Sequence, residues 1–191
     1  MNRNTKIALG IVGALTAGCA GLAVVGYQGA KMAGEALTNA TTNDPDQIAA
    51  IAAEIADFDL PPGYAGRVGM DFMGNRMASF GGASASGGQP QLMLMEYPAG
   101  GMVDSDQLKK QMSASSGQQH SEFVPVETRD LPIRGETSTV TRSRGTDDYG
   151  DELFQEVALF KTDDGLGLFM ALGPVATWNQ TVVDNFLSSL R

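Results

Sequence analysis

One long apolar run and a series of short amphipathic elements divide the chain. Residues 7–30 carry no charged side chain and lie between Lys6 and Lys31. Such a run, about 24 residues long, is sufficient for a membrane-crossing helix, which needs about 20. The pattern predicts an N-terminal transmembrane or signal helix within residues 1–30. A tether of small and polar residues over 31–43 then leads to an outer domain over 44–191.

Charges on either side of the apolar run predict its orientation. Arg3 and Lys6 precede it without any acidic residue, so the chain's net charge of −9 becomes −11 over residues 31–191. By the positive-inside rule, the N-terminus is cytoplasmic and the domain over 44–191 is periplasmic or extracellular. We therefore expect a single-pass membrane protein that is anchored through residues 7–30.

Three fates of the N-terminal segment stay open. It is retained as an anchor, it is a signal peptide that is removed, or it directs lipidation of Cys19. The stretch Leu15-Thr16-Ala17-Gly18-Cys19 resembles a lipobox, although Thr16 stands where leucine is preferred and the run stays apolar beyond Cys19. Small residues four apart at Gly10, Ala14 and Gly18 also allow self-association of an intact anchor.

Helical periodicity predicts three helices in the outer domain, over 44–57, 104–114 and 177–190. In the first, Asp44 is a suitable cap and Pro45 suits the first helical position. Asp104 and Gln107 form a similar start signal for the second helix. We expect Thr177 to cap the last helix.

Alternating and fully apolar stretches predict strands between these helices. Residues 91–97, 152–161 and 166–172 are apolar on both faces, which is typical of a sheet covered on both sides. Tight turns are expected at Met73-Gly74-Asn75 and at 162–165, where Gly165 is free to take a positive φ. The predicted fold is therefore α+β, with an antiparallel sheet sandwiched between helices. The remaining expected strands cover residues 66–72, 76–81, 122–129 and 137–144.

The order of elements resembles the PsbP-like sandwich proteins. The similar features are the stretches 60–64 (LPPGY) and 131–136 (LPIRGE), the hairpin at 152–172 and the final FLSSLR at 186–191. The resemblance covers residues 58–191. It implies an antiparallel sheet between helices in a binding or assembly role, and it assigns no catalytic residue. The stretch 44–64 also resembles uncharacterised membrane-anchored bacterial proteins.

An acidic cluster is the strongest candidate for metal binding. Asp147, Asp148, Asp151 and Glu152 surround Tyr149-Gly150, and oxygen-rich turns can hold calcium. The spacing differs from that of an EF-hand loop, and polar residues are also expected at a hairpin tip. Both interpretations of this cluster stay open.

Methionines form a second candidate set. The chain has ten of them, and thioethers are ligands for Cu(I). Methionine also fills gaps in apolar cores, which is the simpler interpretation of Met93 and Met95 on an apolar strand. The candidate ligands are Met70, Met73, Met77, Met93 and Met95.

Other candidate features have simple structural interpretations. His120 lies in a polar stretch without a matching nucleophile pattern, and the glycine-rich stretch 81–90 lacks the Lys-Ser/Thr pair of a phosphate-binding loop. Cys19 is the only cysteine, so neither an intrachain disulfide nor a zinc site of several Cys and His ligands can form within one chain.

Charge and the candidate residues together limit the function. The acidic domain repels phosphate backbones, which argues against nucleic-acid binding. We expect a non-enzymatic binding or accessory subunit without a cofactor, acting on a protein partner in the cell envelope. The alternatives are a small-molecule or metal carrier, or a hydrolase that uses the carboxylates near Tyr149.

Overall fold

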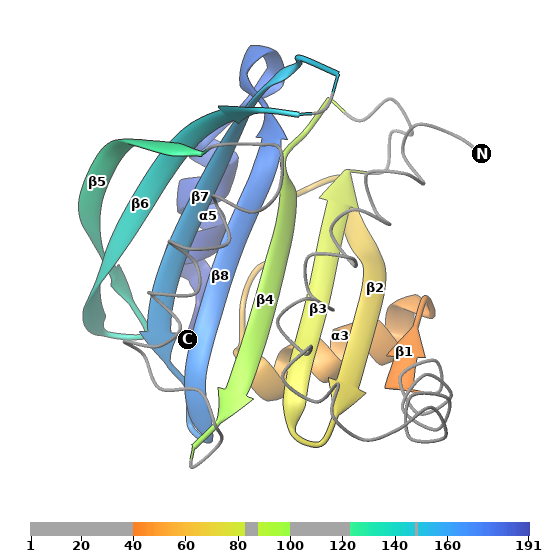
Figure 1. Cartoon of the computed structure of the whole chain (residues 1–191). Coiled ribbons are helices and arrows are strands. Elements are labelled where there is room, and N and C mark those ends of the chain that lie inside the picture. Colours follow the sequence, from red (N-terminus) through yellow and green to blue (C-terminus); the bar gives the residue numbers. More distant parts are fainter. Residues whose placement is uncertain (1–39, 83–87, 100–122, 148) are drawn as a thin grey trace, which may run out of the picture.

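An antiparallel sheet organises the part of the chain that the computed structural model describes, residues 40–82, 88–99, 123–147 and 149–191. Within these residues eight strands are arranged in the order β1-β2-β3-β4-β8-β7-β6-β5 (Figure 1). Every neighbouring pair runs antiparallel. The strands are β1 (Thr41–Thr42), β2 (Tyr64–Phe72), β3 (Asn75–Gly82), β4 (Gln91–Pro98), β5 (Val124–Ile133), β6 (Glu136–Thr146), β7 (Glu152–Lys161) and β8 (Gly165–Pro174).

The α+β class and the antiparallel sheet are confirmed. The predicted strands all occur, with ends shifted by a few residues, and β7 has the predicted bounds. The pair Thr41–Thr42 belongs to the expected tether, yet it forms β1 and pairs with Gly69 and Met70 of β2. The described sheet therefore includes residues before 44. The sequence did not predict this strand, because two threonines give too short a pattern to be recognised.

Both helices of the described residues lie on one face of the sheet. Helix α3 (Pro45–Ile55) and helix α5 (Gln180–Ser189) bury side chains in the same cluster as Ala78, Leu94 and Phe169 (Figure 1). We call this side the helix face. The predicted third helix over 104–114 lies outside the described residues.

Helix α3 begins as predicted and packs closely on β2. The Asp44 side chain accepts a hydrogen bond from the backbone N–H of Asp46, and Pro45 occupies the first turn. A Cβ atom on Gly66 would lie 2.9 Å from Cγ2 of Ile48, a fully buried residue of α3. The missing side chain of Gly66 therefore lets the helix approach the strand.

Helix α5 starts later than expected. Asn179 is its N-cap and accepts a hydrogen bond from the backbone N–H of Val182, while Thr177 ends a 3-10 turn, η2 (Val175–Thr177). The prediction that Thr177 caps a helix over 177–190 was wrong. Asn and Thr are both good caps, and Asn179 stands nearer the residues that pack onto the sheet, Val183, Phe186 and Leu187.

Two hairpins close through two-residue turns. Met73-Gly74 and Arg134-Gly135 have positive φ at both positions, as in type I′ turns. The predicted turn at 73–75 is confirmed. Gly165 does not take the predicted positive φ. It is needed for close approach instead, because a Cβ atom there would lie 2.0 Å from the backbone oxygen of Tyr97.

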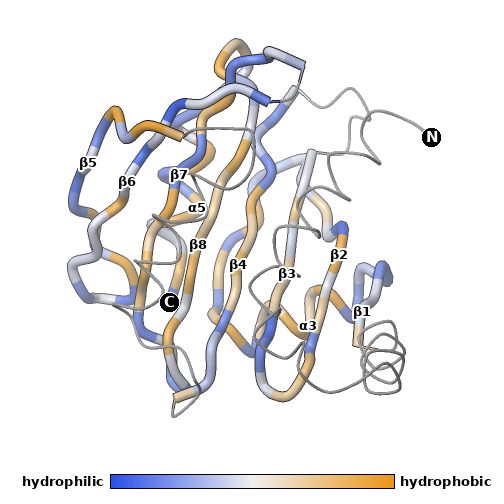
Figure 2. Tube along the Cα trace, in the orientation of Figure 1, coloured by the Kyte–Doolittle hydropathy of each residue, from blue (hydrophilic) through white to orange (hydrophobic). Residues whose placement is uncertain are grey.

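The opposite side of the sheet carries a second apolar cluster. Met77, Met93, Met95 and Leu168 are buried there, and we call this side the methionine face. Residues alternate between the two faces along each strand, so β4 and β8 are apolar on both sides, as predicted. Figure 2 shows the contrast between apolar β8 and the more hydrophilic β6.

The last residue, Arg191, contacts the segment that follows α3. Backbone hydrogen bonds connect Asp57 and Arg191 in both directions, and the Arg191 guanidinium contacts both carboxylate oxygens of Asp59 at 3.2 Å. These contacts bring the ends of α3 and α5 together on the helix face. Among the described helices, none is long and apolar enough to span a bilayer. Residues 7–30 lie outside the described part.

Candidate functional site

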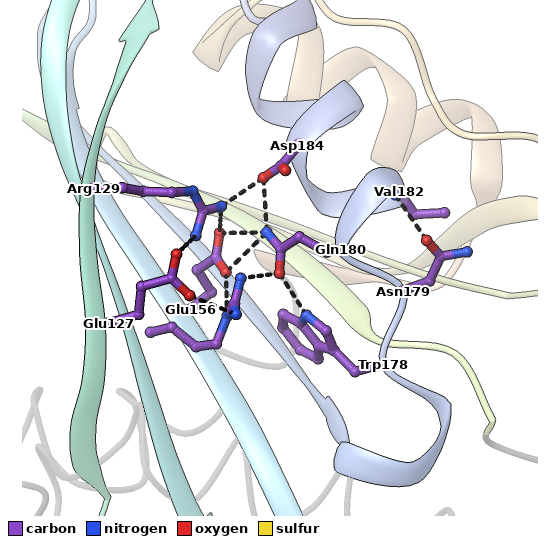
Figure 3. A network of polar contacts seen from close by, with 9 residues as sticks. Glu127, Arg129, Glu156, Trp178, Asn179, Gln180, Val182 and Asp184 are labelled. Atoms are coloured by element: carbon purple, nitrogen blue, oxygen red, sulfur yellow. Dashed lines mark hydrogen bonds and ion pairs between the residues drawn. The ribbon is translucent and has the colours of Figure 1, made fainter.

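A buried polar network lies between α5 and the strands β5, β6 and β7. At its centre is Glu156 of β7, whose side chain is 0% exposed. Arg129 of β5 donates to Oε1 of Glu156 (Figure 3). Arg142 of β6 donates from Nε to Oε2 of Glu156 at 3.1 Å. One buried carboxylate therefore receives charge-assisted hydrogen bonds from two neighbouring strands.

Gln180, the first residue of α5, connects this carboxylate to the helix. Its Nε2 donates to Asp184 at 2.7 Å and more weakly to Glu156, at 3.3 Å from Oε2. Its Oε1 accepts hydrogen bonds from Nε1 of Trp178, at 2.8 Å, and from Arg142. The amide thus donates with one end and accepts with the other, which sets the position of the first turn of α5 over the sheet (Figure 3).

Strand register explains how these residues meet. Glu156 pairs with Arg142 across β6 and β7, and Arg142 pairs with Glu127 across β5 and β6. Opposite charges on directly paired residues stabilise neighbouring strands. Arg129 lies two residues from Glu127 along β5, so its side chain projects from the same face of the sheet.

Charge within the network is nearly balanced. Burial alone lowers the pKa of Arg129, but its hydrogen bond with Glu156 and the charges of Glu156 and Asp184 outweigh burial and raise this pKa. Two arginines face three carboxylates, those of Glu127, Glu156 and Asp184. The set carries little net charge, which is why a buried carboxylate is tolerated between the strands.

Aromatic rings border the network on one side. The guanidinium carbon of Arg142 lies 5.6 Å from the centre of the Phe154 ring, at cation–π distance. Phe154 in turn meets Trp178 edge to face, with ring centres 5.6 Å apart. The contacts join β6, β7 and the segment leading into α5.

A second buried carboxylate lies elsewhere on the helix face. Glu96 of β4 is 1% exposed and pairs with Arg76 of β3 at 2.6 Å. Arg76 also reaches Glu54 of α3 at 2.7 Å. Hydrogen bonding to Glu96 is the largest influence on the pKa of Arg76, which is raised. Each helix therefore forms an ion pair with an arginine that also pairs with a buried glutamate of the sheet. This arginine is Arg76 for α3 and Arg129 for α5.

The predicted acidic cluster mainly forms its own turn. Oδ1 of Asp147 accepts backbone hydrogen bonds from Tyr149 and Asp151, each at 2.9 Å, and Glu152 pairs with Arg144 at 2.6 Å. Asp148 lies outside the described residues. In the part of the chain that the structure describes, no three His, Cys, Asp or Glu side chains are grouped to hold a metal ion.

The structure sorts the remaining candidates into two sets. Met70, Met77, Met93 and Met95 lie together at the methionine face, whereas Met73 is 81% exposed at a hairpin tip. Cys19, His120 and residues 83–87 of the glycine-rich stretch lie outside the described residues.

Sequence reasoning missed the polar network. Glu156 lies on the same face of β7 as Phe154, Ala158 and Phe160. A charged residue on an otherwise apolar strand face was therefore the available signal for a buried polar network. Glu96 follows Leu92 and Leu94 in the same way. A buried acid requires a partner, but the partner arginines come from other strands, and only tertiary pairing identifies them.

Comparisons with known proteins add little to this geometry. Neither a protein-family model nor a curated protein matches the chain. A Pseudomonas aeruginosa protein of unknown function matches 46% of this chain and 60% of its own at 10% identity, with a TM-score of 0.37. LpqN, involved in cell envelope biogenesis of Mycobacterium tuberculosis, matches 69% of this chain and 79% of its own at 9% identity, with a TM-score of 0.36. At this level of similarity, neither structure carries an argument about function.

Proposed function

We propose that the protein is a membrane-anchored extracytoplasmic domain that acts as a non-enzymatic binding or accessory subunit in the cell envelope. The observation that carries this proposal is the uncharged run over residues 7–30, with Arg3 and Lys6 before it and a domain of net charge −11 after it. A run of this length and flanking charge favours a single crossing with the domain outside.

The polar network supports a binding role over catalysis. A carboxylate that transfers protons must reach a substrate and gain and lose its proton during turnover. Glu156 instead receives hydrogen bonds from Arg129, Arg142 and Gln180, and Glu96 pairs with Arg76. These groups stabilise the domain and hold both helices in place, which suits a rigid surface that recognises another molecule.

The complete fold that we propose is the predicted sandwich. The order of the strands favours this fold. β4 and β5 are consecutive along the chain among the described strands, but β8, β7 and β6 lie between them in the sheet, so the connection from β4 to β5 must cross the sheet. Residues 104–114, which the sequence predicts to form a helix, belong to the connection between these two strands. We propose that this helix covers the methionine face, opposite α3 and α5.

Protease accessibility tests the proposed topology. Intact spheroplasts that express the full chain with a C-terminal tag are treated with protease, with and without permeabilisation of the membrane. We expect the tag to be lost from intact spheroplasts while a cytoplasmic control protein survives. Protection of the tag until the membrane is permeabilised would refute the extracytoplasmic placement.

Co-purification tests the accessory role. The tagged full chain is crosslinked in native membranes, purified and analysed for companions by mass spectrometry. A stoichiometric envelope protein is the expected result. Recovery of the chain alone, or crosslinked only to a second copy through the anchor, would contradict a role as accessory subunit.

Methionine placement favours a metal carrier as the second candidate function. Met70, Met77 and Met95 come from three neighbouring strands of the methionine face.

A further inference from the structure

Five methionines form a continuous group on the face of the sheet opposite the helices. Met70 pairs with Met77, and Met77 pairs with Met95, so one row across β2, β3 and β4 consists of methionine. In the next row, Met93 of β4 pairs with Met170 of β8. Register therefore gathers residues that are up to 100 positions apart in the sequence.

The spacing of these residues allows their sulfur atoms to converge. Directly paired residues on neighbouring strands have Cβ atoms about 4.5–5.5 Å apart. Met93 of the next row is a diagonal neighbour of Met77, a separation that long side chains can bridge. Methionine is long, unbranched and flexible, so the thioethers of Met77, Met93 and Met95 can approach a common point. Met77, Met93 and Met95 are 4–6% exposed, and Met70 and Met170 pack against them. The sulfur atoms accordingly lie in a largely water-free setting.

Two polar side chains of this face are directed at sulfur. The Tyr97 hydroxyl lies 3.5 Å from Sδ of Met95, and Nε2 of Gln155 lies 3.7 Å from Sδ of Met170. Sulfur is a weak acceptor, and these contacts orient the two thioethers within the group. Leucine at the same positions would fill the space without offering such a partner.

We propose that the methionine face is a binding site for Cu(I), with the thioether sulfur atoms of Met77, Met93 and Met95 as ligands. Soft sulfur ligands select Cu(I) over harder cations, and three neutral ligands leave a bound monovalent ion with a single positive charge. Met70 and Met170 complete the sulfur-rich surroundings. The site rests on the second candidate function, a metal carrier, and specifies its metal and ligands; it does not depend on the accessory role.

The test measures Cu(I) affinity of the full chain under anaerobic conditions. Cu(I) is supplied as its acetonitrile complex in competition with a chromophoric chelator. All variants carry Cys19→Ser, because a thiolate would bind Cu(I) by itself. The site variant is Met77→Leu/Met95→Leu, and Met73→Leu at the exposed hairpin tip is the matched control.

We expect one Cu(I) per chain in the Cys19→Ser parent and in the Met73→Leu control. The site variant should bind at least tenfold more weakly while keeping its circular dichroism spectrum, since exchange of Met for Leu conserves volume. Equal affinity of a folded site variant, or equal loss in the Met73→Leu control, would overturn the assignment. So would the absence of binding to the parent.

A second measurement decides the question even if the site variant does not fold. X-ray absorption of the Cu(I)-loaded Cys19→Ser parent reports the atoms bound to the metal. A first shell of sulfur alone is expected. A shell that contains nitrogen or oxygen would overturn the proposal. In protein labelled with 13C at the methionine methyl groups, the signals of Met77 and Met95 should shift on loading, whereas that of Met73 should not.

Discussion

Arg142 and Glu156 face each other across β6 and β7, with Nε and Oε2 3.1 Å apart and the glutamate fully buried. Breaking a buried pair by removing one charge typically costs about 3–5 kcal/mol, because the other charge stays buried without a partner. We expect Glu156→Gln to lower the free energy of unfolding by an amount in this range. Urea denaturation followed by the fluorescence of Trp178, the only tryptophan, measures the effect.

The matched control for this prediction is Glu152→Gln. Glu152 pairs with Arg144 on the same two strands, but both side chains are about half exposed. Exposed pairs contribute at most about 1 kcal/mol. Equal losses from Glu152→Gln and Glu156→Gln would show that burial of the network does not govern its contribution.

Close approach at Gly165 leads to a second prediction. A Cβ atom there would lie 2.0 Å from the backbone oxygen of Tyr97 and 2.8 Å from the nitrogen of Ala99, and neither atom can rotate away. Gly165→Ala should lower the free energy of unfolding by about 1–3 kcal/mol, the usual cost of overpacking. Gly88→Ala is the control, since its nearest contact would be 3.8 Å away. If Gly165→Ala leaves the free energy of unfolding unchanged, the close approach at this position is refuted.

Acid should weaken the contact between Arg191 and Asp59, which lies in the segment after α3. The hydrogen bond from Arg191, followed by its charge, lowers the pKa of Asp59 below the usual 3.8. Because the folded pKa is the lower one, the stabilisation is present above pH 3.8 and disappears as the pH falls through the folded value. NMR titration of the Asp59 carboxyl in the parent and in Arg191→Gln measures the shift. An Asp59 pKa that is the same in both proteins would contradict this account.

Two prolines, Pro125 and Pro132, lie in β5, the last strand in the order of the described sheet. Ile133 and Glu136 flank a two-residue turn and form its hydrogen-bonded pair, so the backbone of Pro132 faces outward. Pro125 lies beside the bulge in the same strand. Proline lacks the N–H that an added strand would use, and edge strands commonly carry such residues.

Replacing both prolines by threonine should therefore increase self-association. Sedimentation velocity of the full chain in detergent compares Pro125→Thr/Pro132→Thr with the parent. Pro62→Thr, in the turn before β2, is the control for loss of a proline outside this edge. If the double variant sediments like the parent over a wide concentration range, then the prolines do not limit pairing at this edge.

Local signals in the sequence predicted much of the domain. Apolar positions on both faces of 91–97, 152–161 and 166–172 identified β4, β7 and β8, because covered strands leave few positions for polar residues. Asp44 and Pro45 marked the start of α3, since capping depends on residues within one turn. The start of α5 was less well defined, because Thr177 and Asn179 are both suitable N-caps and packing selected the second.

Tertiary structure decided what depends on residues far apart in the sequence. A run of alternating residues does not reveal its neighbour in the sheet, so the order β4-β8-β7-β6-β5 was not available from the pattern. The same order brings Arg129 and Arg142 to Glu156 and aligns Met70, Met77 and Met95 in one row. The sequence by itself determined the places of β2 to β8, α3 and α5 to within a few residues, because those preferences are local. The pairing of the strands determined the buried network and the sulfur-rich face, because both consist of side chains that meet only across the sheet.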